Sequence, residues 1–77
     1  EGATPVDFAY AVHSQLGDQA VGAKVNGKMV PLDYHLKSGE VVEILVNKNK
    51  KKPSADWLDF VVTRQARKKI SQKLRYN

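Results

Sequence analysis

Apolar side chains recur every four residues near the start of the chain, at Phe8, Val12 and Leu16. This spacing is close to the 3.6-residue period of a helix, so the three side chains are expected to share one stripe facing a core. Thr4 and Pro5 are predicted as the helix cap and first helical residue, and Asp7 suits the positive end of the helix in a variant of the capping box. Gly17 is predicted to end the helix, because glycine enters the left-handed C-cap conformation at low cost. The pattern therefore predicts a helix over residues 5–16.

The middle of the chain alternates apolar residues with small or polar ones, which is typical of β-strands. Three runs show this alternation: residues 21–25, 29–32 and 41–46. Asn26-Gly27 between the first two runs is the strongest short signal for a hairpin turn. Pro31 lacks a backbone N–H and confines the second run to a sheet edge or a strand end. One helix followed by short antiparallel strands predicts an α+β fold.

The composition changes at residues 47–53, which are rich in lysine and end in proline, and this segment is predicted to be a loop or linker. Ser54 is predicted to cap a short helix that contains Trp57, Leu58 and Phe60. Thr63 is predicted to cap a second helix with a narrow apolar ridge, formed by Ala66, Ile70 and Leu74. A ridge this thin docks onto another surface but forms no core by itself.

Charge is distributed unevenly along the 77 residues. Residues 48–77 hold ten of the thirteen basic side chains and two of the eight acidic ones, a net charge of +8, whereas residues 1–47 carry −3. Such a basic segment attracts polyanions over a long range, and nucleic acid is the commonest such partner. A solvated helix face is the alternative interpretation, and charge alone does not separate the two.

The residues offer little for catalysis. The chain has no cysteine, and its two histidines, His13 and His35, do not provide the three or four ligands of a zinc site. His13, Ser14 and Asp18 could be drawn as a hydrolytic triad, but neighbouring residues on a helix do not face each other. We therefore expect no catalytic residue, no metal site and no cofactor. No apolar run approaches the ~20 residues of a membrane span, and with no secretory leader we expect a cytoplasmic chain.

The aromatic residues near the C-terminus allow two interpretations. Trp57 and Phe60 lie among cations and could stack on unpaired bases, or they could dock a short helix onto the rest of the domain. Docking is the favoured prediction, and Ile70 is assigned to the same docking surface. Tyr10 and Tyr34 are expected to be partly exposed.

Three parts of the chain resemble one known family. Residues 2–13 read Gly-Ala-Thr-Pro-Val-Asp-Phe-Ala-Tyr-Ala-Val-His, and residues 21–28 read Val-Gly-Ala-Lys-Val-Asn-Gly-Lys, followed by Val-Pro-Leu. Residues 56–63, Asp-Trp-Leu-Asp-Phe-Val-Val-Thr, and residues 66–70, Ala-Arg-Lys-Lys-Ile, extend the match. These stretches resemble the TGS domain of RelA/SpoT-type (p)ppGpp synthetases and hydrolases, together with the start of the helical domain that follows it. TGS domains also occur in threonyl-tRNA synthetases and some GTPases, but the Asp-Trp-Leu continuation favours the RelA/SpoT type.

The resemblance implies a ubiquitin-like β-grasp fold. In the family an opening β-hairpin precedes the position of Gly2, and this hairpin is missing here. It divides the chain into a partial TGS domain (1–47), a basic linker (48–53) and the start of a helical domain (54–77). It also implies a regulatory role in the stringent response, with catalysis in another part of a longer bacterial enzyme. That enzyme would be a GTP pyrophosphokinase, a (p)ppGpp 3′-pyrophosphohydrolase, or both.

The implied partners are uncharged tRNA and the ribosome, reached through the longer protein. Family members often carry a histidine near the tRNA end where this chain has Asp18, so either the contact is reworked through Gln19 and Lys24 or this member senses something else. The predicted nucleic-acid contacts are Asp18, Gln19, Lys24, Lys28, Lys50, Lys51, Lys52, Arg64 and Lys68. The rival hypothesis is a protein-interaction module that docks neighbouring domains of the same chain or acyl carrier protein. An exposed strand edge also predicts self-association.

Overall fold

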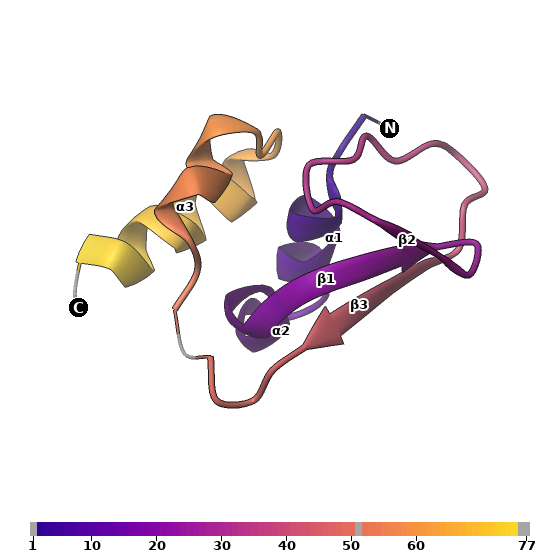
Figure 1. The fold of residues 1–77 in the computed structure, drawn as a ribbon. Helices are drawn as coiled ribbons and strands as arrows, with labels where there is room; N and C mark the ends of the chain where they lie inside the picture. Colours follow the sequence, from indigo (N-terminus) through magenta and orange to yellow (C-terminus); the bar gives the residue numbers. More distant parts are fainter. Residues whose placement is uncertain (1, 51, 76–77) are drawn as a thin grey trace.

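The computed structural model describes residues 2–50 and 52–75, and Figure 1 shows their arrangement. Two helices, three strands, a 3₁₀ helix and a final helix follow one another along the chain. In order they are α1 (Pro5–Val12), α2 (Ser14–Gln19), β1 (Ala20–Val25), β2 (Lys28–Val30), β3 (Val42–Val46), η1 (Ala55–Asp59) and α3 (Arg64–Arg75). This mixture confirms the predicted α+β class.

The three strands form one antiparallel sheet in the order β2-β1-β3. β1 lies in the centre, where Ala23 is opposite both Val30 on β2 and Ile44 on β3. The turn between β1 and β2 has positive φ angles at Asn26 (51°) and Gly27 (84°), as a tight two-residue hairpin requires. The hairpin predicted from Asn-Gly is therefore confirmed.

The predicted single helix over residues 5–16 is wrong, because the chain leaves the helical conformation at His13. His13 is extended (φ −166°, ψ 141°), and its Nδ1 accepts a hydrogen bond of 3.0 Å from the backbone N–H of Gln15. This bond caps a second helix, α2, which continues past Gly17 to Gln19. Gly17 therefore does not end a helix.

The start of α1 matches the prediction closely. The Thr4 hydroxyl accepts from the backbone N–H of Asp7 at 3.3 Å, and the Asp7 carboxylate accepts from the backbone N–H of Thr4 at 2.9 Å. Both halves of a capping box are present, with Pro5 at the first helical position. Local sequence alone therefore sets where α1 begins.

The face of α1 that meets the core differs from the predicted stripe. Phe8 is 38% exposed and Val12 is 59% exposed, whereas Val6, Ala9 and Tyr10 are buried. The chain carries apolar residues on two sides of this helix, and periodicity does not say which side another element covers. The segment that covers the Val6 side comes more than forty residues later, which is why the stripe prediction is wrong.

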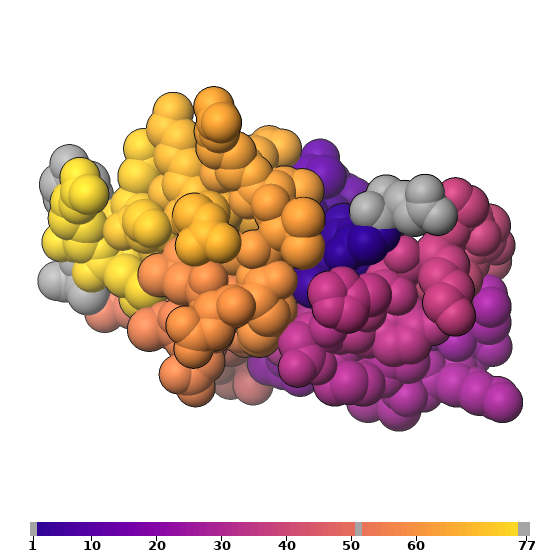
Figure 2. All heavy atoms as spheres, turned by 90° about the horizontal axis from the view of Figure 1, so that it is seen from above, coloured from indigo at the N-terminus to yellow at the C-terminus, as the bar shows by residue number. Residues whose placement is uncertain are grey.

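That later segment completes the core. Trp57, 6% exposed, and Ile70, fully buried, form one hydrophobic cluster with Val6 and Tyr10 of α1. Other residues of the cluster or packed against it are Ala20, Val61, Ala66, Leu32, Ile44, Leu58, Phe60 and Leu74. Figure 2 shows the orange and yellow C-terminal segment lying directly beside the indigo start of the chain. Burial of Trp57 agrees with docking rather than base stacking. The division of the chain into a partial TGS domain, a linker and the start of a helical domain stays a prediction.

Of the two helix caps predicted near the C-terminus, Thr63 is confirmed and Ser54 is wrong. The Thr63 hydroxyl accepts from the backbone N–H of Ala66 at 3.2 Å, so Thr63 caps α3 as expected. Ser54 makes no side-chain capping bond, and the segment after it is a 3₁₀ helix. The ridge of α3 is confirmed, because Ala66 and Ile70 are fully buried and Leu74 packs against the core.

Tyr10 is 1% exposed, so its predicted partial exposure is wrong. The ring lies against the backbone of Gly17, where a Cβ atom would be 2.5 Å from three ring carbons. Gly17 is therefore needed because α2 approaches the Tyr10 ring too closely for any side chain. Tyr34 is half-buried, in agreement with its prediction.

Gly17→Ala is expected to lower the free energy of unfolding by about 1–3 kcal/mol, because the new methyl group overlaps the buried Tyr10 ring. Gly22→Ala is the matched control, since a Cβ there would lie 3.5 Å or more from Leu45 and Met29, at ordinary contact distance. Urea unfolding followed by circular dichroism measures both changes. Equal stability of the two variants would contradict the close approach.

Asp7 also joins α1 to the segment just before α3. Its carboxylate accepts from the backbone N–H of Val62 at 3.0 Å and from the backbone N–H and hydroxyl of Thr63, both at 2.8 Å. Burial raises the pKa of Asp7, but the hydrogen bonds from Thr4, Thr63 and Val62 outweigh it and hold the pKa below its ordinary value. The ionised carboxylate therefore stabilises the fold.

Asp7→Asn is expected to lower the free energy of unfolding at pH 7 by about 2–4 kcal/mol, because a neutral amide replaces a buried acceptor of several N–H bonds. Since the folded pKa lies below the unfolded one, the contribution of Asp7 is complete above the ordinary carboxyl pKa and is lost as the pH falls through the folded value. The gap between the parent chain and Asp7→Asn should therefore shrink between pH 6 and pH 2.5 in urea unfolding. Exposed Asp59→Asn is the control, and a similar gap for that variant would contradict the assignment to Asp7.

Candidate functional site

The three residues considered as a hydrolytic triad, His13, Ser14 and Asp18, each accept a hydrogen bond from a different partner. His13 accepts from Gln15, the Ser14 hydroxyl accepts from the Lys69 ammonium at 2.6 Å, and the Asp18 carboxylate accepts from the Tyr10 hydroxyl. Within residues 2–50 and 52–75, no three His, Cys, Asp or Glu side chains gather in a way that could hold a metal ion. In the same residues, no helix combines the length and apolar character needed to cross a bilayer.

Asp18 lies inside the fold rather than on the surface expected of an RNA contact. It is 9% exposed, its Oδ1 accepts from the Tyr10 hydroxyl at 2.7 Å, and its Oδ2 lies 3.5 Å from the Lys73 ammonium. Burial raises the pKa of Tyr10, and the hydrogen bond and charge of Asp18 raise it further. The carboxylate is therefore already engaged, which reduces the repulsion that an exposed acid would exert on phosphate.

Lys50 is also held within the protein. Its ammonium donates to the backbone oxygen of Asp18 at 3.0 Å and to that of Lys52, and it lies 4.4 Å from the ring centre of Trp57. Burial lowers the pKa of Lys50, partly opposed by the charge of Asp18. Lys50 thus belongs to the lysine-rich segment predicted as a loop or linker, yet it contacts the core residue Trp57.

The other described residues among the predicted contacts lie in three places: the β1–β2 hairpin, the end of α2 with the loop before η1, and α3. Lys24, half-buried, and Lys28, exposed, belong to the β1–β2 hairpin, which lies at the opposite end of the molecule from α3 in Figure 1. Gln19 is half-buried at the end of α2, and Lys52 is exposed in the loop before η1. Lys51 lies outside the described residues. The structure therefore does not bring the predicted contacts together on one surface.

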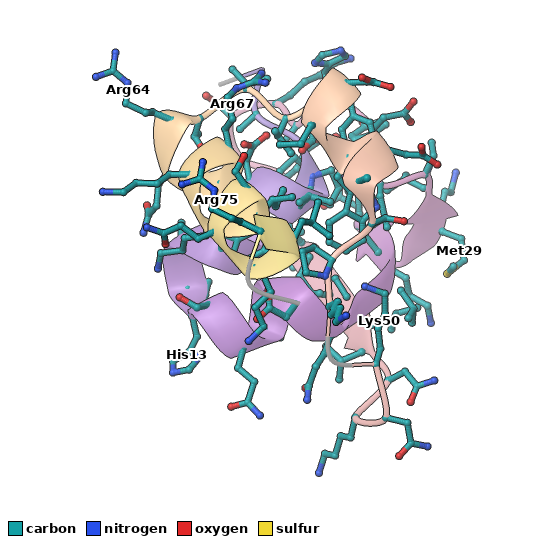
Figure 3. All side chains as sticks on the ribbon, turned by 90° about the vertical axis from the view of Figure 1, so that its left-hand side faces the viewer. His13, Met29, Lys50, Arg64, Arg67 and Arg75 are labelled. Carbon is teal, nitrogen blue, oxygen red and sulfur yellow. The ribbon has the colours of Figure 1, made fainter. Side chains whose placement is uncertain are left out.

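The outward side of α3 carries the clearest basic surface. Arg64, Lys68 and Arg75 are exposed and share the side opposite the buried ridge; we call them the α3 basic face. A shallow hollow of about 470 Å³ runs between Arg64, Gln65, Lys68, Lys69 and Gln72. Figure 3 shows Arg64 extending away from the body of the protein. Helix α3 has no acidic residue to offset this charge.

Arg67 lies on the same helix but has a structural role. Its guanidinium donates to the backbone oxygens of Leu58 at 3.2 Å and Val61 at 3.1 Å. Leu58 belongs to η1 and Val61 to the segment between η1 and α3, so these bonds satisfy carbonyl groups at and just after the end of η1. Arg67 therefore joins η1 to α3.

An apolar surface was missed by the sequence analysis. Phe8 and Val12 on α1 are exposed, as is Val62, which is 55% exposed. Phe8 also borders a hollow of about 300 Å³ between α1 and the loop around Leu36. The missed signal was the second apolar side of α1, which had been assigned to the core. β2 and β3 form the two edges of the sheet, and self-association through an edge stays a prediction.

The comparisons with known proteins agree with this fold. The TGS domain family matches residues 1–46. The chain is 56% identical over 75 residues to the guanosine-3′,5′-bis(diphosphate) 3′-pyrophosphohydrolase of Aquifex aeolicus, covering 97% of this chain and 11% of that protein. It is 58% identical over 69 residues to the GTP pyrophosphokinase of Myxococcus xanthus, covering 90% of this chain and 9% of that protein.

A third relative is the bifunctional (p)ppGpp synthase/hydrolase RelA of Mycobacterium tuberculosis, 51% identical over 72 residues, which cover 92% of this chain and 10% of that protein. The chain spans about a tenth of the length of these curated relatives. The chain belongs to the TGS domain family, and the relatives that it matches are (p)ppGpp synthetases and hydrolases of the RelA/SpoT type.

Proposed function

We propose that this chain is the regulatory module of a longer (p)ppGpp synthetase or hydrolase, and that it contacts uncharged tRNA. The relatives act as GTP pyrophosphokinase, as pyrophosphohydrolase, or as both by their names, and the chain matches only about a tenth of each. Catalysis and the binding of any cofactor would then belong to other parts of the longer protein. Contact with the ribosome would also be made through the longer protein.

The observation that carries the RNA part of the proposal is the α3 basic face. Arg64, Lys68 and Arg75 project from a helix whose other side is fixed by Ile70 in the core. Cations held on a rigid helix can meet successive phosphates without a large loss of conformational freedom. Asp18 opposes such an approach only weakly, because Tyr10 and Lys73 already contact its carboxylate.

Deacylated tRNA is expected to bind the chain at low salt and to bind much more weakly at high salt, because cations that meet phosphates release counterions. The double variant Arg64→Ala/Lys68→Ala should lower the slope of log affinity against log salt by about 1 to 2. Lys37→Ala, which removes an exposed lysine from the loop between β2 and β3, should leave the slope nearly unchanged.

Fluorescence anisotropy at three salt concentrations measures these slopes. Absence of binding at low salt, or equal slopes for the double variant and the parent chain, would remove the α3 basic face from the proposal.

A second candidate function is protein docking, favoured by the exposed apolar side of α1. Phe8 and Val12 lie next to each other on the helix surface, four residues apart, and Val62 is exposed as well. This surface would bind a neighbouring domain of the longer protein or acyl carrier protein. The first partner needs the longer protein, whereas acyl carrier protein can be tested directly.

Under this second function, Phe8→Ser/Val12→Ser is expected to weaken binding of purified acyl carrier protein about tenfold or more, because two apolar contacts are lost. Arg64→Ala/Lys68→Ala is the matched test of simple charge attraction and should change the affinity much less. Calorimetric titration gives both values, and circular dichroism checks that each variant is folded. A larger loss in the charge variant than in the apolar variant would contradict docking through α1.

A further inference from the structure

A second positively charged region lies beside α2, away from the α3 basic face. A hollow of about 500 Å³ opens there, and three lysines line it: Lys48 and Lys50 from the loop after β3, and Lys73 from the last turns of α3. His13 and Gln19 line the side formed by α2. We call this cavity the α2 hollow. Its volume is within the range of small-molecule sites in proteins, about 300–1,000 Å³.

The polar groups around the α2 hollow are mostly donors. Asp18 is the one carboxylate among the described lining residues, and it already accepts from Tyr10 and faces Lys73 at 3.5 Å. Nδ1 of His13 accepts from Gln15, which leaves Nε2 as the ring's other polar atom. The hollow therefore has an excess of positive charge and of donors.

The three lysines are held to different degrees. Lys50 is fixed by two backbone oxygens and the Trp57 ring, whereas half of the Lys73 side chain is exposed and its ammonium forms an ion pair with Asp18 at 3.5 Å. Lys48 is exposed and has no hydrogen bond or ion pair to any residue within 2–50 and 52–75. Lys48 and Lys73 can therefore adjust to an anion with more than one charged group, and Lys50, whose donors are already used within the fold, adds a fixed positive charge beside them.

We propose that the α2 hollow binds a small ligand with two or more adjacent phosphate groups, of the kind found in a nucleoside triphosphate. A single phosphate would leave much of the lysine charge unmatched, whereas a chain of phosphates can meet ammonium groups from both the loop and α3. The amide of Gln19 offers both a donor and an acceptor at the rim for the rest of the ligand. Such a ligand would tie the loop after β3 to the end of α3.

This site is separate from the α3 basic face, although Asp18, Gln19 and Lys50, which line it, are also among the nucleic-acid contacts predicted from the sequence. Lys73 lies on the side of α3 that faces Asp18, whereas Arg64 and Lys68 face outward. In Figure 3, Arg64 extends at the upper left of the molecule, whereas Lys50 lies lower, right of centre. A ligand in the α2 hollow therefore does not need the α3 basic face.

The test uses GTP and inorganic pyrophosphate as probes, titrated into the chain at constant ionic strength without divalent cations. We expect saturable binding of both, with amide chemical-shift changes centred on residues 13–19, 48–50 and 73 in NMR spectra. Lys48→Ala and Lys73→Ala should each weaken binding about three- to tenfold. Lys28→Ala removes the same charge from the distant hairpin and should have little effect.

Three results would overturn the site: no saturable binding, chemical-shift changes elsewhere on the surface, or an equal loss of affinity in Lys28→Ala and Lys48→Ala. If Lys73→Ala proves unfolded by circular dichroism, Lys48→Ala alone decides, because Lys48 is exposed and its removal breaks no side-chain hydrogen bond or ion pair among the described residues. Titration of tRNA into Lys48→Ala and into Arg64→Ala/Lys68→Ala separates this site from the RNA proposal. tRNA binding that survives when GTP and pyrophosphate fail to bind overturns the α2 hollow and leaves the RNA contact standing.

Discussion

Helix α1 is stable in its position because a segment more than forty residues away covers it. Val6 and Tyr10 on one side of this helix bury against Trp57 and Ile70, and the Asp7 carboxylate accepts from the N–H groups that lead into α3. An ionised carboxylate can accept from the start of α1 and the start of α3 at once, because it offers about four lone-pair sites and no donor. The direction of α3 depends on the hydrogen bonds that Asp7 accepts from Val62 and Thr63. The positions of the charged side chains on α3 depend on the same bonds.

The close packing at Tyr10 has consequences beyond the core. Because Gly17 lets the ring approach α2, the Tyr10 hydroxyl reaches Asp18, and Asp18 in turn faces Lys73. The buried ring thus sets the position of the carboxylate between two helices. Asp18, an acidic residue that looks unsuited to phosphate recognition, therefore serves as a hydrogen-bond acceptor within the fold.

Signals that act within a few residues could be predicted from the sequence, and signals that depend on distant segments could not. The capping box at Thr4, the Asn26-Gly27 hairpin and the Thr63 cap are local hydrogen-bond and backbone-angle preferences, and each is confirmed. The buried side of α1 was missed because it is decided by residues after position 49. The burial of Asp18 was missed because it depends on the packing of Tyr10 against Gly17 and on Lys73. The break at His13 was missed for another reason: a histidine rarely supplies a helix cap, so its local signal is weak.

The lysines show why charge counted along a sequence does not predict a binding surface. Lys48 and Lys50 are two residues apart in one basic run, yet Lys48 is exposed, while Lys50 donates to backbone oxygens over the Trp57 ring. Arg64 and Arg67 differ in the same way, since Arg67 binds the carbonyl groups of η1. Cations that satisfy the protein's own acceptors hold the fold together, and only the remaining ones are available to an outside anion. The core leaves Arg64 and Lys68 on the outer side of α3 and Lys48 beside the α2 hollow, so the positive charge of this part of the chain is divided between two separate surfaces.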